Sequence, residues 1–91
     1  MKRVIRTSSY RNDLDAIESF IAKDNPVAAL DMWFLIDDQV TKLANSNFPR
    51  REGRVPGTME LVAHENYIVI LEEDATNVMA LNVVHVRQQW P

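Results

Sequence analysis

The spacing of apolar residues changes halfway along the chain, and this change restricts the fold more than any other feature of the sequence. In the first half, Tyr10, Leu14, Ile17 and Ile21 recur at intervals of four, three and four residues, which places them on one face of a helix. In the second half, short runs rich in Val and Ile alternate with polar segments, a pattern typical of strands joined by turns. The pattern predicts helices packed on a sheet, the α+β class.

Two helices are expected in the first half. The first follows a short strand over residues 2–7, and its N-cap is one of three consecutive hydroxyl residues, Thr7, Ser8 and Ser9. The second begins at Pro26, with Asn25 as its cap, and runs to about residue 45. Because the link between them is short, they are expected to form an antiparallel hairpin. The buried stripe of the second helix comprises Ala29, Trp33, Ile36, Val40 and Leu43, and it is widened by Leu30 and Phe34.

Three strands are expected in the second half, over residues 58–63, 67–71 and 78–86. The Pro and Gly residues between 45 and 57 predict an irregular segment before them. The expected architecture is therefore an N-terminal strand, a two-helix hairpin and a three-stranded antiparallel meander, with the helices on one face of one sheet. At 91 residues the chain is expected to form a single domain over residues 1–91.

Charge and composition exclude several classes of protein. The net charge is −3 at pH 7, so contact with nucleic acid would have to rest on a local basic cluster. There is no Cys, which is compatible with a reducing cytoplasm and leaves no thiolate ligands for a metal. The longest apolar run, 67–71, is too short to cross a membrane. We expect a cytoplasmic protein that acts without a membrane, a metal or another cofactor.

Several segments, taken in order, resemble one known family. Residues 53–62 read Gly-Arg-Val-Pro-Gly-Thr-Met-Glu-Leu-Val, residues 66–70 read Asn-Tyr-Ile-Val-Ile, and residues 83–91 read Val-Val-His-Val-Arg-Gln-Gln-Trp-Pro. The first helix contains Asp-Leu-x-x-Ile and the second opens with Pro-x-Ala-Ala. In this order the chain resembles the RelE/ParE superfamily, the toxins of bacterial type II toxin–antitoxin systems. The resemblance covers nearly the whole chain and implies the same α+β fold.

The chain departs from that family pattern at positions that are often basic or proton-handling. Met59 stands where many members have Arg, and Ile68 stands where the RNA-cleaving RelE type has Arg. Leu71 and Glu72 stand where many members have Tyr and a basic residue. These departures remove cationic groups, so the resemblance implies the fold more strongly than it implies catalytic potency.

His85 and Arg87 are the candidate catalytic residues. They are two apart in an expected strand and would project from the same face. A His can move protons near neutral pH, and an adjacent Arg can stabilise the charge that develops in phosphoryl transfer. The pair would suit RNA cleavage by attack of the 2′-hydroxyl on its own phosphate. The alternative is a His and an Arg that meet only solvent or an acidic neighbour at a strand end.

Arg50, Arg51 and Arg54 form the densest basic cluster and are candidates for binding RNA phosphates. The alternative is a solvated loop in which Glu52 is their partner. Trp90 is a candidate for stacking on a base, although a hydrophobic latch that holds the last strand is the favoured interpretation.

The resemblance implies three alternative functions and one constant partner. The chain is a ribosome-dependent mRNA endoribonuclease (an mRNA interferase) as in the RelE branch, a non-enzymatic inhibitor of DNA gyrase as in the ParE branch, or an attenuated toxin that mainly binds its antitoxin. Of these, the endoribonuclease is the expected function, and it depends on His85, Arg87 and Arg54. Each version implies a cognate antitoxin, and operator DNA would be reached only indirectly, through that antitoxin.

Overall fold

The first strand and the first helix are joined by a single residue, Thr7. In the computed structural model, which describes residues 1–88, β1 (Arg3–Arg6) ends directly before Thr7, and α1 (Ser8–Ala22) begins directly after it. The Thr7 hydroxyl accepts a hydrogen bond from the Tyr10 amide at 3.1 Å, which confirms the expected hydroxyl cap. The same hydroxyl donates to the carbonyl oxygen of Ala80 at 2.9 Å. The cap therefore also holds the start of α1 against the sheet.

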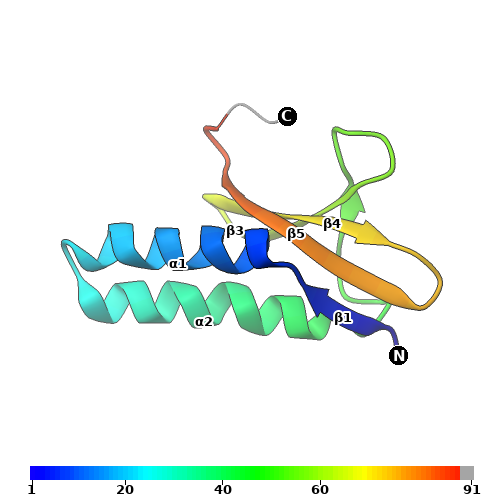
Figure 1. Cartoon of the computed structure of the whole chain (residues 1–91), viewed down its shortest axis with the longest axis horizontal. Coiled ribbons are helices and arrows are strands. Elements are labelled where there is room, and N and C mark those ends of the chain that lie inside the picture. Colours follow the sequence, from blue (N-terminus) through cyan, green and yellow to red (C-terminus); the bar gives the residue numbers. More distant parts are fainter. Residues whose placement is uncertain (89–91) are drawn as a thin grey trace.

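The second helix, α2 (Pro26–Lys42), begins as expected and ends slightly earlier. The side-chain oxygen of Asn25 accepts a hydrogen bond from the Ala28 amide at 3.0 Å, and Pro26 occupies the first turn, where its missing N–H costs nothing. Figure 1 shows α1 and α2 lying side by side as a hairpin on one side of the sheet. The expected helical hairpin is confirmed.

The sheet has five strands in the order β1-β5-β4-β3-β2. The expected meander is β3 (Met59–His64), β4 (Tyr67–Glu73) and β5 (Asn77–His85), paired antiparallel. β1 joins this sheet by pairing parallel with the first half of β5. The expectation of an irregular segment over 45–57 was wrong for two residues, because β2 (Arg51–Glu52) pairs with the start of β3.

The sheet has one face covered by helices and one open face. The run from Tyr67 to Leu71 in the central strand β4 is buried throughout, because Tyr67, Val69 and Leu71 belong to the core under the helices and the residues between them pack on the other face. On the open face, Ile68, Ile70 and Val84 form a small buried cluster with Leu81 packed against it. The larger core lies under the helices and includes Tyr10, Leu14, Ile36, Val40, Leu43, Leu61, Val69, Leu71 and Val78.

One carboxylate links the first strand to both helices. Asp37 on α2 accepts hydrogen bonds from the Tyr10 hydroxyl and from Nε of Arg6, both at 2.9 Å. Burial of the ring, followed by the hydrogen bond to Asp37 and the charge of that carboxylate, raises the pKa of Tyr10 above its ordinary value. The phenol is therefore held in its neutral form within the fold.

The raised pKa of Tyr10 predicts a loss of stability in alkali. The unfolded chain releases the tyrosine proton near pH ~10 and the folded chain does not, so this contribution is complete below that pH and declines as pH rises. The free energy of unfolding of the wild type should fall by about 1.4 kcal/mol per pH unit more steeply than that of Tyr10→Phe. Urea denaturation at about pH 8 and about pH 11 measures the difference. Equal slopes for the two proteins would contradict the assignment.

Candidate functional site

His85 lies at the last residue of β5, opposite Tyr67 on β4. The two rings meet edge to face with their centroids 5.3 Å apart. Nδ1 of His85 accepts a hydrogen bond from the Arg87 amide at 3.0 Å. In the neutral imidazole this leaves the proton on Nε2, so one nitrogen is engaged with the backbone and the other can act as a donor.

Arg87 does not lie on the strand. The expectation that His85 and Arg87 project from one strand face was wrong, because β5 ends at His85 and the chain turns over residues 86–88. The turn is held by Gln88, whose side-chain oxygen accepts from the His85 amide at 2.7 Å and whose amide donates to the His85 carbonyl oxygen at 2.8 Å. The pair is brought together by backbone hydrogen bonds rather than by strand alternation, and its catalytic role stays a prediction.

A groove runs beside His85 between α1 and the ends of β4 and β5. It has a volume of about 320 Å³ and is open to solvent. Asp13 stands at its edge, where the carboxylate accepts hydrogen bonds from the Asn82 side chain and the Val83 amide, both at 3.0 Å. The groove is mainly apolar, which suits a protein segment better than a phosphate. Its apolar lining comprises Ala16, Ile17, Phe20, Tyr67 and Val83.

The Arg50 side chain is buried and held by partners inside the protein. It is only 6% exposed, and its Nη1 lies 3.0 Å from Oε2 of Glu73. The guanidinium also donates to the carbonyl oxygens of Leu43, Asn45 and Phe48. These three residues belong to the segment between α2 and β2, which leads into the sheet. These partners engage the guanidinium inside the protein, and a role for Arg50 in binding RNA phosphate stays a prediction.

Arg51 and the loop after it are anchored by Glu60. This carboxylate is 3% exposed, although it belongs to the open face of the sheet. One oxygen lies 3.1 Å from Nη2 of Arg51, and the other accepts a hydrogen bond from the Arg54 amide at 3.2 Å. The alternative interpretation named Glu52 as the partner of this cluster, but Arg50 pairs with Glu73 and Arg51 pairs with Glu60. Much of its positive charge is thus neutralised within the fold.

Arg54 and His85 border one small cleft on the open face. The cleft has a volume of about 10 Å³ and a floor formed by Ile68, Ile70 and Val84. This is about the space that one water molecule needs on the same measure, roughly 10–15 Å³. Ile68, which replaces a basic residue of the RelE type, is part of this packed floor. Trp90, the remaining candidate for RNA contact, lies outside the residues that the structure describes.

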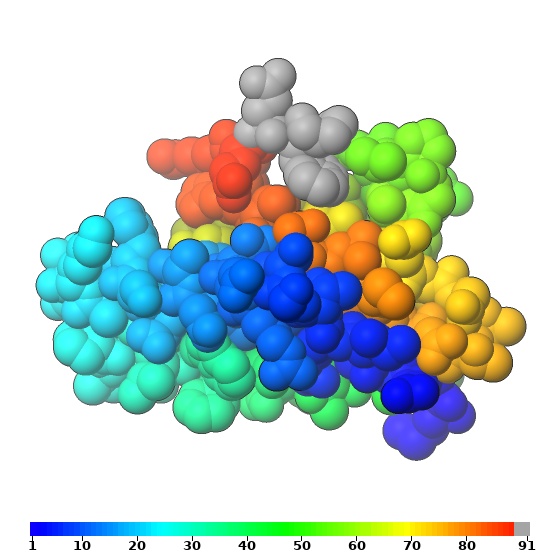
Figure 2. Space-filling view, in the orientation of Figure 1, coloured from blue at the N-terminus to red at the C-terminus, as the bar shows by residue number. Residues whose placement is uncertain are grey.

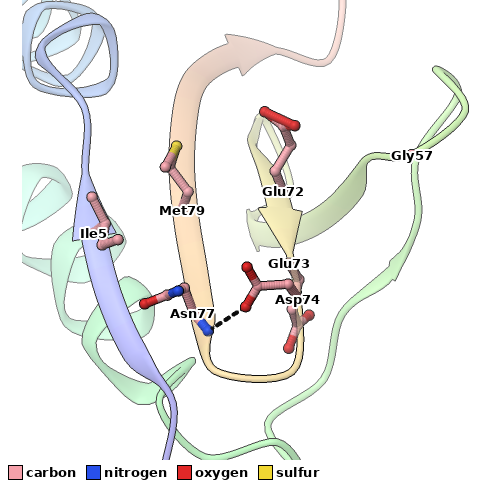
Figure 3. Close-up of a pocket in the computed structure, with 7 residues that line it drawn as sticks. All are labelled: Ile5, Gly57, Glu72, Glu73, Asp74, Asn77 and Met79. Carbon is pink, nitrogen blue, oxygen red and sulfur yellow. Dashed lines mark hydrogen bonds between the residues drawn. The ribbon is translucent and has the colours of Figure 1, made fainter.

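A third hollow, on the open face near the β4–β5 turn, is lined by acidic residues (Figure 3). Asp74 accepts hydrogen bonds from the amides of Thr76 and Asn77 at 2.8 and 2.7 Å. These bonds, with that from Thr76 the largest cause, lower the pKa of Asp74. Glu73 is held by Lys2 and Arg50. The carboxylates therefore stabilise the turn, and among residues 1–88 no group of three or more His, Cys, Asp or Glu is arranged to hold a metal.

The family model of the ParE toxin of the type II toxin–antitoxin system parDE matches residues 4–90. The chain belongs to the ParE toxin family. It is 36% identical over 90 residues to the candidate toxin Y4kP of Sinorhizobium fredii, with 99% of this chain and 94% of that protein covered.

The fold of this ParE-family chain also matches a solved structure. The chromosomal ParDE toxin–antitoxin system from P. aeruginosa aligns with a TM-score of 0.82 at 24% identity, over 96% of this chain and 98% of that one. The expected α+β fold and the toxin superfamily are thus confirmed. The chain is a toxin of the ParDE type, which pairs with an antitoxin. Within residues 1–88 no helix has the length and apolar character needed to span a membrane.

The buried position of Arg50 predicts a large effect on stability. Arg50→Ala leaves the Glu73 carboxylate and three carbonyl oxygens without this partner, and should lower the free energy of unfolding by about 3 kcal/mol. Arg11→Ala, at an exposed position on α1, is the matched control and should change it by less than about 0.5 kcal/mol. Chemical denaturation of the purified proteins compares them. A loss for Arg50→Ala no larger than that of the control would show that the clamp is not structural.

Proposed function

We propose that this ParE-family chain arrests growth by binding DNA gyrase, without catalysing a reaction. The observation that supports the proposal is that the arginines expected to bind RNA form contacts within the protein. Arg50 is buried against Glu73, Arg51 is paired with Glu60, and the Arg54 amide donates a hydrogen bond to Glu60. The residues expected to hold RNA phosphates are largely engaged in holding the lead-in to the sheet.

The side chains around His85 do not favour RNA cleavage. The reaction needs a positioned acid and base together with donors aimed at the phosphate as charge develops on it. His85 engages Nδ1 with the Arg87 amide, and the three positions that are basic in potent relatives hold Met59, Ile68 and Glu72. A net charge of −3 adds no general attraction for RNA. Each of these observations supports binding over catalysis.

Binding to a protein target requires a different kind of surface, which the chain has. The groove beside His85 is apolar, and Phe20 at its edge is 68% exposed. Exposed apolar patches next to polar rims are typical of protein interaction sites. A toxin that acts through such a surface needs affinity for its target and no proton-transfer group.

Two assays on one purified preparation distinguish gyrase inhibition from mRNA cleavage. We expect the chain to inhibit supercoiling of relaxed plasmid by gyrase and to leave mRNA intact in a translation reaction followed by primer extension. His85→Ala and Arg87→Ala should change the inhibitory concentration by less than about tenfold, because loss of an interface-rim side chain rarely costs more. An acid–base residue of an enzyme would instead cost about 10²–10⁴ in rate. His64→Ala is the matched control for His85→Ala.

Two outcomes would contradict the proposal. Cleaved mRNA with unaffected supercoiling, abolished by His85→Ala, would establish the endoribonuclease. No effect in either assay, with normal growth on overexpression, would establish an attenuated toxin, and Met59→Arg would then test whether the lost basic residue is the cause.

A further inference from the structure

The groove beside His85 contains a carboxylate that is not paired with a cation. Asp13 lies at the edge of this groove, between α1 and the end of β5. Figure 2 shows that end of β5, in orange and red, lying along α1, in blue. The carboxylates of Asp37, Glu60 and Glu73 are each paired with a Lys or an Arg. No Lys or Arg among residues 1–88 forms such a pair with Asp13.

The hydrogen bonds that hold Asp13 in place use only one of its two oxygens. β1 pairs with β5 as far as Ala80, so the edge of β5 beyond that residue has no neighbouring strand within the described part of the chain. Asp13 fills this gap, because its Oδ2 accepts hydrogen bonds from the Asn82 side chain and the Val83 amide. The carboxylate is therefore fixed by Oδ2, and its Oδ1 can accept a hydrogen bond from a partner.

Tyr67 contributes a second polar group to the groove. This residue is 9% exposed and lines the groove. Its ring contacts the rings of His64 and His85, but its hydroxyl forms no hydrogen bond with any residue in the range 1–88. A buried tyrosine hydroxyl normally has a hydrogen-bond partner. A ligand in the groove would supply that partner.

The apolar residues of α1 in the groove are spaced from Asp13 like alternate side chains of an extended chain. Ile17 and Phe20 follow Asp13 by four and seven residues on α1, which corresponds to about 6 and about 10 Å along the helix. In an extended chain, side chains on the same face recur every two residues, about 6.6 Å apart. None of the described residues that line the groove is Lys or Arg, so Asp13 attracts a cation at this end.

We propose that the groove binds an extended protein segment in which a basic side chain stands two residues from an apolar one. The apolar side chain packs on Ile17 and Phe20, and the basic side chain pairs with Oδ1 of Asp13. A backbone carbonyl oxygen of the segment accepts a hydrogen bond from the Tyr67 hydroxyl. The inference rests on the proposed function for the role of the groove as the target-binding surface, and it adds the chemistry that the groove recognises.

The charge preference is tested with the peptide acetyl-Leu-Ser-Arg-Ser-Leu-amide, which reads the same in both directions. The peptide is titrated into the full-length chain, and the amide signals of Ile17 and Val83 are followed by NMR. We expect it to bind at least about fivefold more tightly than the same peptide with Glu in place of Arg. Asp13→Asn, which keeps an oxygen for the two internal hydrogen bonds, should abolish that difference. Asp31→Asn, at an exposed position on α2, is the matched control and should preserve it.

The role of the Tyr67 hydroxyl is tested with Tyr67→Phe. Because this hydroxyl has no hydrogen-bond partner among residues 1–88, its removal should leave the melting temperature unchanged or raise it. The Kd of the Arg peptide should rise about threefold. Tyr10→Phe is the matched control, because the Tyr10 hydroxyl is bonded to Asp37. That variant should lower the melting temperature and leave Kd unchanged.

Three results would overturn the inference. Equal Kd values for the Arg and Glu peptides, or a difference that persists in Asp13→Asn, would contradict the assigned charge preference. Unchanged peptide binding by Phe20→Ser would place the peptide outside the groove. Gyrase inhibition that Asp13→Asn leaves unchanged would show that the groove does not recognise its target in this way. Failure of the wild type to inhibit gyrase, with the peptide preference intact, contradicts the proposed function alone and supports the recognition chemistry.

Discussion

The parallel pairing of β1 with β5 is the contact on which the rest of the structure depends. It joins Arg3–Arg6 to residues 77–80 near the other end of the chain. Since α1 begins two residues after β1, this pairing also decides where the helical hairpin lies on the sheet. Thr7 makes the link rigid, because one hydroxyl both caps α1 and bonds the backbone of β5. The groove beside His85 exists because α1 is held over this strand.

Two glutamates decide what the basic cluster can do. Glu73 receives Lys2 and Arg50, and Glu60 receives Arg51 together with the Arg54 amide. Glu73 lies 23 residues from Arg50 in the sequence, and Glu60 stands opposite Arg51 because β2 pairs with β3. Buried ion pairs of this kind fix a geometry more than they add net stability. The cluster therefore organises the lead-in to the sheet, which supports a toxin that acts by binding.

Features that depend on residues close together in the sequence were predicted better than features that depend on distant segments. The caps at Thr7 and Asn25 and the start of α2 depend on neighbours a few residues away, and they were predicted well. β2 was missed, because a two-residue strand has no periodicity of its own and forms only by pairing with β3. The end of β5 was placed one residue too late, because Gln88 turns the chain by bonding back to His85. That single residue removed the geometric basis for pairing His85 with Arg87 on one face.

The sequence by itself determined the class of fold, the helical hairpin, the meander and the toxin superfamily, because these follow from apolar periodicity, capping residues and ordered motifs. Only the tertiary structure decided which arginines turn inward, that β1 runs parallel to β5, and which apolar side chains stay exposed. Leu30 and Phe34 were expected to widen the buried stripe of the second helix, and this was wrong, because both side chains are exposed on α2. The physical reason is that burial and ion pairing are set by which distant segments meet, and a pattern of neighbouring residues does not record that.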